Sequence, residues 1–188
     1  MSQTVDEIHA KFVPLIGKEY TLPLTRNKGL TGTYLEDLLG IPHTSNCLDC
    51  SDGELKVFPM KKLKNGALVP KETIAVTMLN KDELRTCDFK DSKCLKKMTM
   101  MLLVPYLRTG DVIQFMGAKV VNLLDDEYKG LYDILEADYN EIRQKYLANG
   151  VLESSTGTLL QNRTKGAGHG STSRAYYLRP EFMKKYVC

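Results

Sequence analysis

The sequence lacks both a long apolar run and a strong excess of charge of one sign. No stretch approaches the roughly 18 apolar residues of a membrane span, and the N-terminus has no signal-peptide profile. The formal net charge is only +3 over 188 residues. A nucleic-acid site must therefore be a local basic patch rather than a property of the whole surface. We expect a cytoplasmic protein with no membrane contact.

The sequence also lacks internal repeats, low-complexity linkers and a clean zinc-finger spacing. Cys47-x-x-Cys50 could form half of a zinc site with Cys87 and Cys94, but the second spacing is wide. Five cysteines without a signal peptide favour reduced thiols, so we expect free thiols rather than structural zinc. With 43% hydrophobic and 26% charged residues, residues 1–188 are expected to fold as a single domain with a sizeable core.

Apolar residues at helical spacing predict three helical segments. The first covers 5–15 and stops before Gly17. The second starts near Thr31 to Thr33, where Thr33-x-x-Glu36 has the form of a capping box, and stops at Gly40. One long helix or two short ones are expected over 125–147, ending near Asn149-Gly150.

Strand signals lie between these helices and after the last one. Asn65-Gly66 is a hairpin signal, so the segments on either side of it should pair antiparallel, and "TIAVTML" should be a central strand. The expected strands cover 54–62, 69–79, 98–106 and 112–121. The chain should end in a strand, a Gly/Ser-rich loop, a strand and a short helix. The pattern predicts an α+β (α/β) fold around a sheet.

One short segment places carboxylates and a lysine at the start of a predicted strand. Asp49 and Asp52 precede Glu54-Leu55-Lys56. Because strand side chains alternate between faces, Glu54 and Lys56 would lie roughly 6–7 Å apart on one face, with Leu55 toward the core. This set could hold a divalent metal and handle a water molecule. The plainer interpretation is a surface strand with a solvated acid–lysine pair.

Three segments resemble, in the same order, the signature blocks of one family. The family comprises the MutH-type mismatch-repair nicking endonucleases and the related GATC-cutting type II restriction endonucleases. "NKGLTGTYLEDLLG" (27–40) fits KG-x-x-G-x-x-LE-x-x-LG, and "LDCSDGELKVFP" (48–59) fits D-x(n)-G-x-ELK-x-x-P. "LQNRTKG…YYLRPEF" (160–182) fits LQ-x-R-x-K…(F/Y)YL-x-x-x-F.

The resemblance implies a PD-(D/E)xK restriction-endonuclease-like fold, with a central mixed sheet flanked by helices. It also implies magnesium-dependent hydrolysis of double-stranded DNA. By match, Glu36, Asp49, Glu54 and Lys56 would be catalytic, and the three carboxylates among them would bind Mg²⁺. Lys56 would position or deprotonate the attacking water.

The loop between the aspartate and the E-x-K pair is shorter here than in the family, and it contains two aspartates. Asp49 fits the metal-binding position if the loop is trimmed by two residues. Asp52 is the rival, but it lies only two residues before Glu54. We favour Asp49 on this spacing.

Basic and aromatic residues near the C-terminus are candidates for reading DNA. The expected DNA contacts are Lys28, Lys93, Lys97, Arg163, Lys165 and Tyr177. The strand–loop–strand at about 156–188 would enter the major groove, where a basic side chain can donate to guanine. The lysines before it suit phosphate contacts. His169 and Arg174 belong to a loop that the family does not fix.

The resemblance leaves the kind of endonuclease open. A restriction enzyme would cut both strands of GATC or a related short site, as a homodimer on the palindrome or as a monomer by successive nicks. The chain ends soon after "FMKK", which favours this interpretation over a repair enzyme that nicks when partner proteins activate it. A member of another class, a DNA-recognition module that has lost catalysis, would keep the fold alone. A bacterial or viral origin would fit each of these.

Overall fold

The computed structural model describes residues 3–25, 27, 29–43, 47–166 and 172–188. The chain divides into two compact units. Unit 1 comprises residues 1–72, 100–121 and 186–188, and unit 2 comprises residues 73–99 and 122–185. That both units act as one endonuclease domain stays a prediction.

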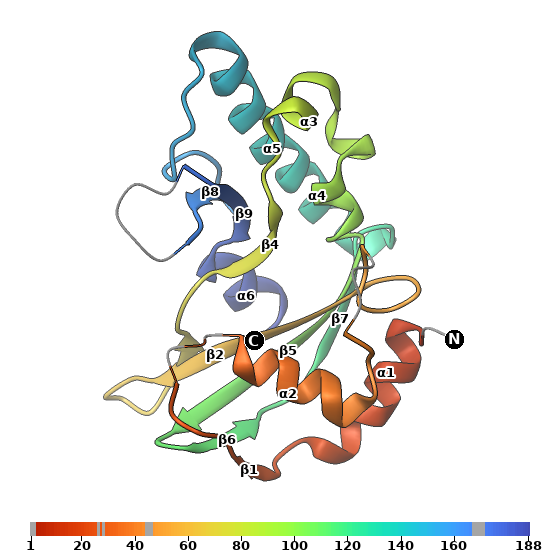
Figure 1. Ribbon diagram of the computed structural model, residues 1–188, viewed down its shortest axis with the longest axis vertical. Helices are drawn as coiled ribbons and strands as arrows, with labels where there is room; N and C mark the ends of the chain where they lie inside the picture. The colour runs from red at the N-terminus through yellow and green to blue at the C-terminus, as the bar shows by residue number, and fades with distance from the viewer. Residues whose placement is uncertain (1–2, 26, 28, 44–46, 167–171) are drawn as a thin grey trace. The chain divides into compact units, whose positions relative to one another are not determined.

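Unit 1 is built on a six-stranded mixed sheet with the order β1-β6-β5-β2-β3, and β7 also pairs with β5 (Figure 1). Its strands are β1 (Glu19–Thr21), β2 (Glu54–Lys62), β3 (Leu68–Pro70), β5 (Met100–Thr109), β6 (Val112–Phe115) and β7 (Lys119–Asn122). The two long central strands, β2 and β5, run parallel, with Glu54 beside Met101. The neighbouring pairs β1–β6, β5–β6 and β2–β3 are antiparallel. This is the mixed α+β architecture that the sequence predicts.

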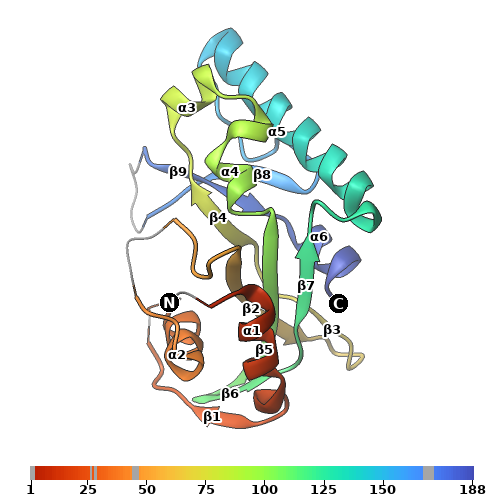
Figure 2. The same cartoon turned by 90° about the vertical axis from the view of Figure 1, so that its right-hand side faces the viewer.

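Two helices cover one face of this sheet (Figures 1 and 2). They are α1 (Val5–Phe12), extended by a 3-10 turn at Val13–Leu15, and α2 (Leu30–Leu39). Phe12 of α1 and Leu35 of α2 are fully buried, in one core with Leu55 of β2 and Leu102 of β5. This core fixes which face of β2 turns inward. Because side chains alternate along a strand, Glu54 and Lys56 lie on the opposite face from Leu55.

The helix α2 begins within one residue of its predicted start, but the predicted capping box is wrong. The helix begins at Leu30 with Gly29 as its N-cap, and no side chain caps it. Asn27 makes the turn before it, because its Oδ1 accepts the Gly29 amide at 3.0 Å. Thr33 therefore lies inside the helix and forms no capping box with Glu36. The predicted end is confirmed, since Gly40 adopts the left-handed conformation at φ 68°.

The predicted pairing across Asn65-Gly66 is confirmed for β3, but not for the strand that follows it. The β2 and β3 strands pair antiparallel around Asn65-Gly66, with Lys62 opposite Leu68. The next strand, β4 (Ile74–Met78), pairs instead with β9 in a separate three-stranded sheet, where it is an edge strand rather than a central one. The β-branched composition of β4 indicates a strand but carries no information on its partner.

The predicted strand at 98–106 is confirmed as β5, whereas the single strand predicted at 112–121 is wrong. Residues 112–121 form two strands, β6 and β7, with 116–118 between them. Both strands pair with β5. A continuous apolar run cannot mark such a break, because the break depends on which stretch of β5 each part meets.

Unit 2 combines a three-stranded sheet with a long helix. The sheet has the order β4-β9-β8, and its remaining strands are β8 (Leu160–Thr164) and β9 (Arg174–Leu178). The helices of this unit are α3 (Lys81–Thr86), α4 (Lys93–Lys96), α5 (Lys129–Asn149) and α6 (Pro180–Tyr186), with 3-10 turns at Phe89–Asp91 and Asp126–Tyr128. Of the two alternatives for 125–147, the single long helix is confirmed, and so are the two strands and the short helix at the C-terminus. Residues 167–171 of the predicted loop lie outside the described residues. No described helix is long and apolar enough to cross a membrane.

Candidate active site

Glu54 and Lys56 form a buried ion pair at the start of β2. The Glu54 side chain is 1% exposed, and its Oε2 lies 2.5 Å from Lys56 Nζ, whose side chain is 16% exposed. The expected shared face is therefore confirmed, but the pair is not the solvated surface pair of the plainer interpretation. A carboxylate that is almost completely buried is costly unless it is paired and hydrogen-bonded. A surface strand would be stable without such a buried ion pair.

Asp49 lies against the first residues of the same strand. Its Oδ2 accepts a hydrogen bond from the Leu55 amide at 3.2 Å, so its carboxylate is held next to the strand that begins with Glu54. The connecting turn is tight, because the Cys50 amide donates to the Gly53 carbonyl at 2.9 Å. A Cβ on Gly53 would lie 2.5 Å from the Met100 carbonyl oxygen, so only glycine fits against β5 here.

Asp52 has a different partner. Its Oδ1 accepts the Val5 amide at 2.8 Å, and Val5 is the first residue of α1. The first amides of a helix have no partner within the helix, so Asp52 satisfies one of them. The two aspartates thus bind different elements, because Asp52 contacts α1 whereas Asp49 contacts β2. That Asp49 rather than Asp52 binds a metal stays a prediction.

Glu36 is held by a histidine that the sequence analysis missed. Its Oε2 lies 3.1 Å from Nδ1 of His43, while Nε2 of His43 lies 2.7 Å from Oδ1 of Asp37. The hydrogen bond with Asp37 is the main reason that the pKa of His43 is raised, and both carboxylates add to the effect. One histidine just after a helix end gives no sequence signal for this contact.

The carboxylates of the candidate site are suitable ligands for a hard divalent cation, but they do not form a complete ligand set. Oxygen donors are what Mg²⁺ prefers, so Asp49 and Glu54 fit its chemistry. Within the described residues, however, no three His, Cys, Asp or Glu side chains converge on a metal-sized position. Glu36 is engaged by His43 in this conformation.

The electrostatic potential in the turn before β2 is negative. Cys50 is buried in this turn, and the pKa of its thiol is raised to about 12. Burial is the largest cause, and the negative charges of Asp49, Asp52 and Glu54 add to it. The field that disfavours a thiolate here would favour a cation. None of the five cysteines forms a disulfide.

Three of the predicted DNA contacts share one face of the β8–β9 hairpin. Tyr176 stacks on Tyr139 of α5 with ring centroids 5.8 Å apart, so its face of the hairpin is turned toward α5. Tyr177 alternates to the other face. Arg163 pairs with Ala175 in the register, which places it on the face of Tyr177, and Lys165 follows by alternation.

The other predicted DNA contacts are lysines that lie outside the β8–β9 hairpin. Lys93 is exposed at the start of α4, whose N-cap is Ser92. Lys97 is partly buried just after the same helix. Lys28 lies outside the described residues, as does His169. Unit 1 thus carries the predicted catalytic residues, and unit 2 carries the described DNA-contact candidates.

A buried aspartate that the sequence analysis missed fixes the start of β8. Asp138 of α5 is 4% exposed. Its Oδ1 accepts the Thr158 amide at 2.6 Å, and its Oδ2 accepts the Leu159 and Leu160 amides at 2.7 and 2.8 Å. The available signal was a charged residue at a helix position that apolar spacing predicts to be buried.

Residues 45–125 match the family model described as MutH, the DNA mismatch repair enzyme. No curated protein matches the chain. The matched span contains Asp49, Glu54 and Lys56, whereas Glu36 and the β8–β9 residues lie outside it. The family has a restriction-endonuclease-like fold, and its members are typically DNA endonucleases that use divalent metals. Over residues 45–125, this chain is therefore similar to the MutH family of DNA mismatch repair enzymes.

Proposed function

We propose that this chain is a magnesium-dependent endonuclease that cleaves double-stranded DNA at a short specific site. The observation that carries the proposal is the buried Glu54–Lys56 pair, with Asp49 bonded to the amide of the residue between them. The pair lies within the span that matches the MutH family. A purely structural strand has no need of a buried acid–lysine pair beside a further carboxylate.

Each residue of the proposed site has a distinct task. Asp49 and Glu54 would hold Mg²⁺, and Glu36 would join them from α2. Bound Mg²⁺ would neutralise charge on the scissile phosphate and lower the pKa of a ligated water. Lys56 is held by Glu54 on the face away from the core, where its ammonium can position the attacking water or exchange a proton with it.

Unit 2 would supply sequence recognition. Arg163 and Lys165 can donate to guanine O6 and N7 in the major groove, and Tyr177 on the same face can contact a neighbouring base. Lys93 and Lys97 would bind phosphates, which position the DNA without specifying its sequence. The family resemblance makes GATC, or a related short palindrome, the first site to test.

Type II restriction cleavage is the first choice, and strand nicking in mismatch repair is the alternative. Purified protein, Mg²⁺ and an unmethylated plasmid with one GATC site separate the two. Linear product without added factors supports restriction cleavage, and accumulating nicked circles support the repair enzyme. An intact plasmid across several sequences would contradict both.

A catalytically inactive DNA-recognition module is the alternative from another class. The observation in its favour is that no three metal-ligating side chains converge within the described residues. Titration calorimetry with Mg²⁺ on the wild type and on Glu54→Gln separates the classes. Mg²⁺ binding that is lost in the variant supports the enzyme. Tight DNA binding with no Mg²⁺ binding supports the module.

A further inference from the structure

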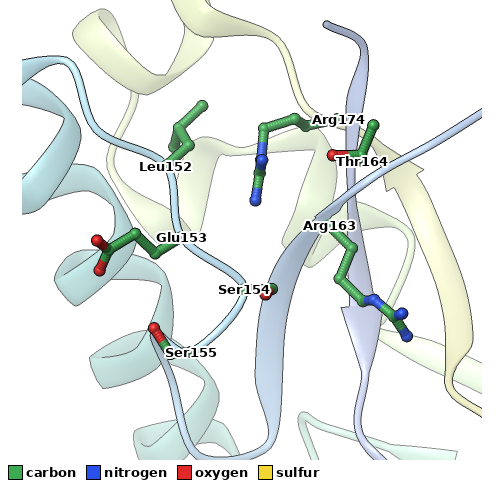
Figure 3. Close-up of a pocket in the computed structure, with 7 residues that line it drawn as sticks. All are labelled: Leu152, Glu153, Ser154, Ser155, Arg163, Thr164 and Arg174. Carbon is green, nitrogen blue, oxygen red and sulfur yellow. The ribbon is translucent and has the colours of Figure 1, made fainter. Parts of the chain in front are cut away.

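A second arginine of unit 2, Arg174, has its side chain on the other face of the β8–β9 hairpin from the side chain of Arg163, and both residues line one pocket. Seven residues line an open pocket of about 510 Å³: Leu152, Glu153, Ser154, Ser155, Arg163, Thr164 and Arg174 (Figure 3). Arg174 pairs with Thr164 and shares the face of Tyr176 by alternation. In Figure 3, the guanidinium groups of Arg174 and Arg163 point in different directions.

Arg174 is built into the wall of this pocket. Its Nε donates to Asn162 Oδ1 at 2.5 Å, and its Nη2 donates to the Asn162 carbonyl at 3.2 Å. Asn162 is fully buried and donates from Nδ2 to the Glu153 carbonyl at 3.0 Å. These bonds tie β9, β8 and the loop after α5 together. The guanidinium is therefore pre-positioned, which lowers the entropic cost of binding.

The loop after α5 forms the other wall of the pocket, and Arg179 holds this loop in place. Arg179 donates from Nε to the Gly157 carbonyl at 3.1 Å and from Nη2 to the Ser154 carbonyl at 2.8 Å. Several carbonyl oxygens of the loop are thereby occupied. Ser154 and Ser155 of this loop also line the pocket.

One positive charge in this pocket is the guanidinium of Arg174, which has no carboxylate partner among the described residues. Arg174 forms no ion pair with any described residue, and partial burial lowers the pKa of its guanidinium while leaving it charged. Glu153 also lines the pocket, but its carboxylate points away from the Arg174 guanidinium (Figure 3). A half-buried arginine that Asn162 holds in place is suited to a phosphate group, whose oxygens accept the paired donors of a guanidinium.

We propose that the Arg174 pocket binds a backbone phosphate of the DNA and acts separately from the base-reading face of Arg163, Lys165 and Tyr177. This inference rests on the proposed function. The open form of the pocket suits a phosphodiester that continues past it in both directions, rather than an enclosed small molecule. Such a contact sets the position of the hairpin on the duplex but carries no sequence information.

The salt dependence of DNA binding tests this assignment. Fluorescence anisotropy in EDTA, with a GATC duplex and a scrambled duplex, gives the slope of log K against log salt concentration for the wild type, Arg174→Gln and Arg163→Gln. Loss of one phosphate contact lowers the magnitude of the slope by about 0.9. Arg174→Gln should show this loss with an unchanged ratio between the two duplexes. Arg163→Gln should reduce the ratio. An unchanged slope in Arg174→Gln, or a reduced ratio, would overturn the assignment.

A second pair of variants covers the case in which Arg174→Gln does not fold. Glu153→Gln removes a carboxylate from the pocket but keeps the carbonyl that binds Asn162. It should tighten binding of both duplexes by about two- to fivefold, the effect of one partly screened charge. Arg174→Lys should keep the wild-type slope. Unchanged affinity in Glu153→Gln would contradict the phosphate pocket. A wild type that binds neither duplex would overturn the proposed function as well, whereas wild-type binding with unresponsive pocket variants overturns only the pocket.

Discussion

The Asp52 carboxylate accepts the amide of Val5 at 2.8 Å, across 47 positions of sequence. This bond ties the turn before β2 to the first residue of α1, while Asp49 in the same turn bonds to β2 itself. The two aspartates thus separate into one that supports the fold and one that lies beside the ion pair of the candidate site.

Substitution of each aspartate should separate these tasks. Asp52→Ala leaves the Val5 amide without its partner and should lower the free energy of unfolding by about 1 kcal/mol. Plasmid cleavage per folded molecule should be retained in this variant. Asp49→Ala should abolish cleavage and leave DNA binding measurable. Urea unfolding measures the stability of each variant, and plasmid digestion measures its cleavage. Loss of cleavage in Asp52→Ala with full cleavage in Asp49→Ala would assign the metal to Asp52.

Gly53 should tolerate no side chain. A Cβ at this position would lie 2.5 Å from the Met100 carbonyl oxygen and 2.6 Å from Val5 Cγ2. Gly53→Ala should therefore lower the free energy of unfolding by about 1–3 kcal/mol, the usual cost of overpacking. Gly130→Ala in α5 is the matched control, because a Cβ there meets nothing within 4 Å. Equal stability of the two variants in urea unfolding would show that the turn can shift freely.

Asp138→Asn should be among the most destabilising isosteric changes in unit 2. The amide has one acceptor oxygen where the carboxylate has two, and three backbone amides depend on that carboxylate. We expect a loss of about 2–4 kcal/mol in the free energy of unfolding. Asp133→Asn, at an exposed position of the same helix, should change it by less than about 0.5 kcal/mol. Similar losses in both variants would contradict this role.

His43 should titrate above its ordinary pKa of 6.5, because it lies between Glu36 and Asp37. Asp37→Asn should lower the pKa of His43 more than Glu36→Gln does, since the bond to Asp37 is the larger cause. A raised pKa in the folded state means that the protonated ring adds stability below the unfolded pKa. This stability is lost as the pH rises through the folded value. NMR titration of the imidazole measures both shifts. A larger shift in Glu36→Gln would reverse the ranking.

The parts of the fold that were predictable from sequence are those set by local pattern. The Asp49-to-Lys56 segment is continuous, so strand alternation alone places Glu54 and Lys56 on one face and Leu55 on the other. The long helix and its glycine stop at Gly150 follow from apolar period and turn chemistry in the same way.

The parts that were missed depend on partners distant in sequence. The strand β4 pairs with β9, about a hundred residues later, and no property of "TIAVTML" specifies that choice. His43 reaches Glu36 only after α2 has ended at Gly40. Asp138 differs because its burial was predictable from helical spacing, whereas its three amide partners follow from the fold of the next loop.

Cleavage by paired glutamate variants tests the central claim most directly. The wild type, Glu54→Gln and Glu19→Gln are incubated with unmethylated GATC plasmid, with Mg²⁺ and with EDTA. Glu19 lies on β1 at the edge of the sheet and is exposed, so its variant controls for the loss of one negative charge. We predict Mg²⁺-dependent cleavage by the wild type and Glu19→Gln. We also predict a loss of at least about a hundredfold in Glu54→Gln, since metal-site carboxylates are costly to replace. Undiminished cleavage by Glu54→Gln would contradict the central claim.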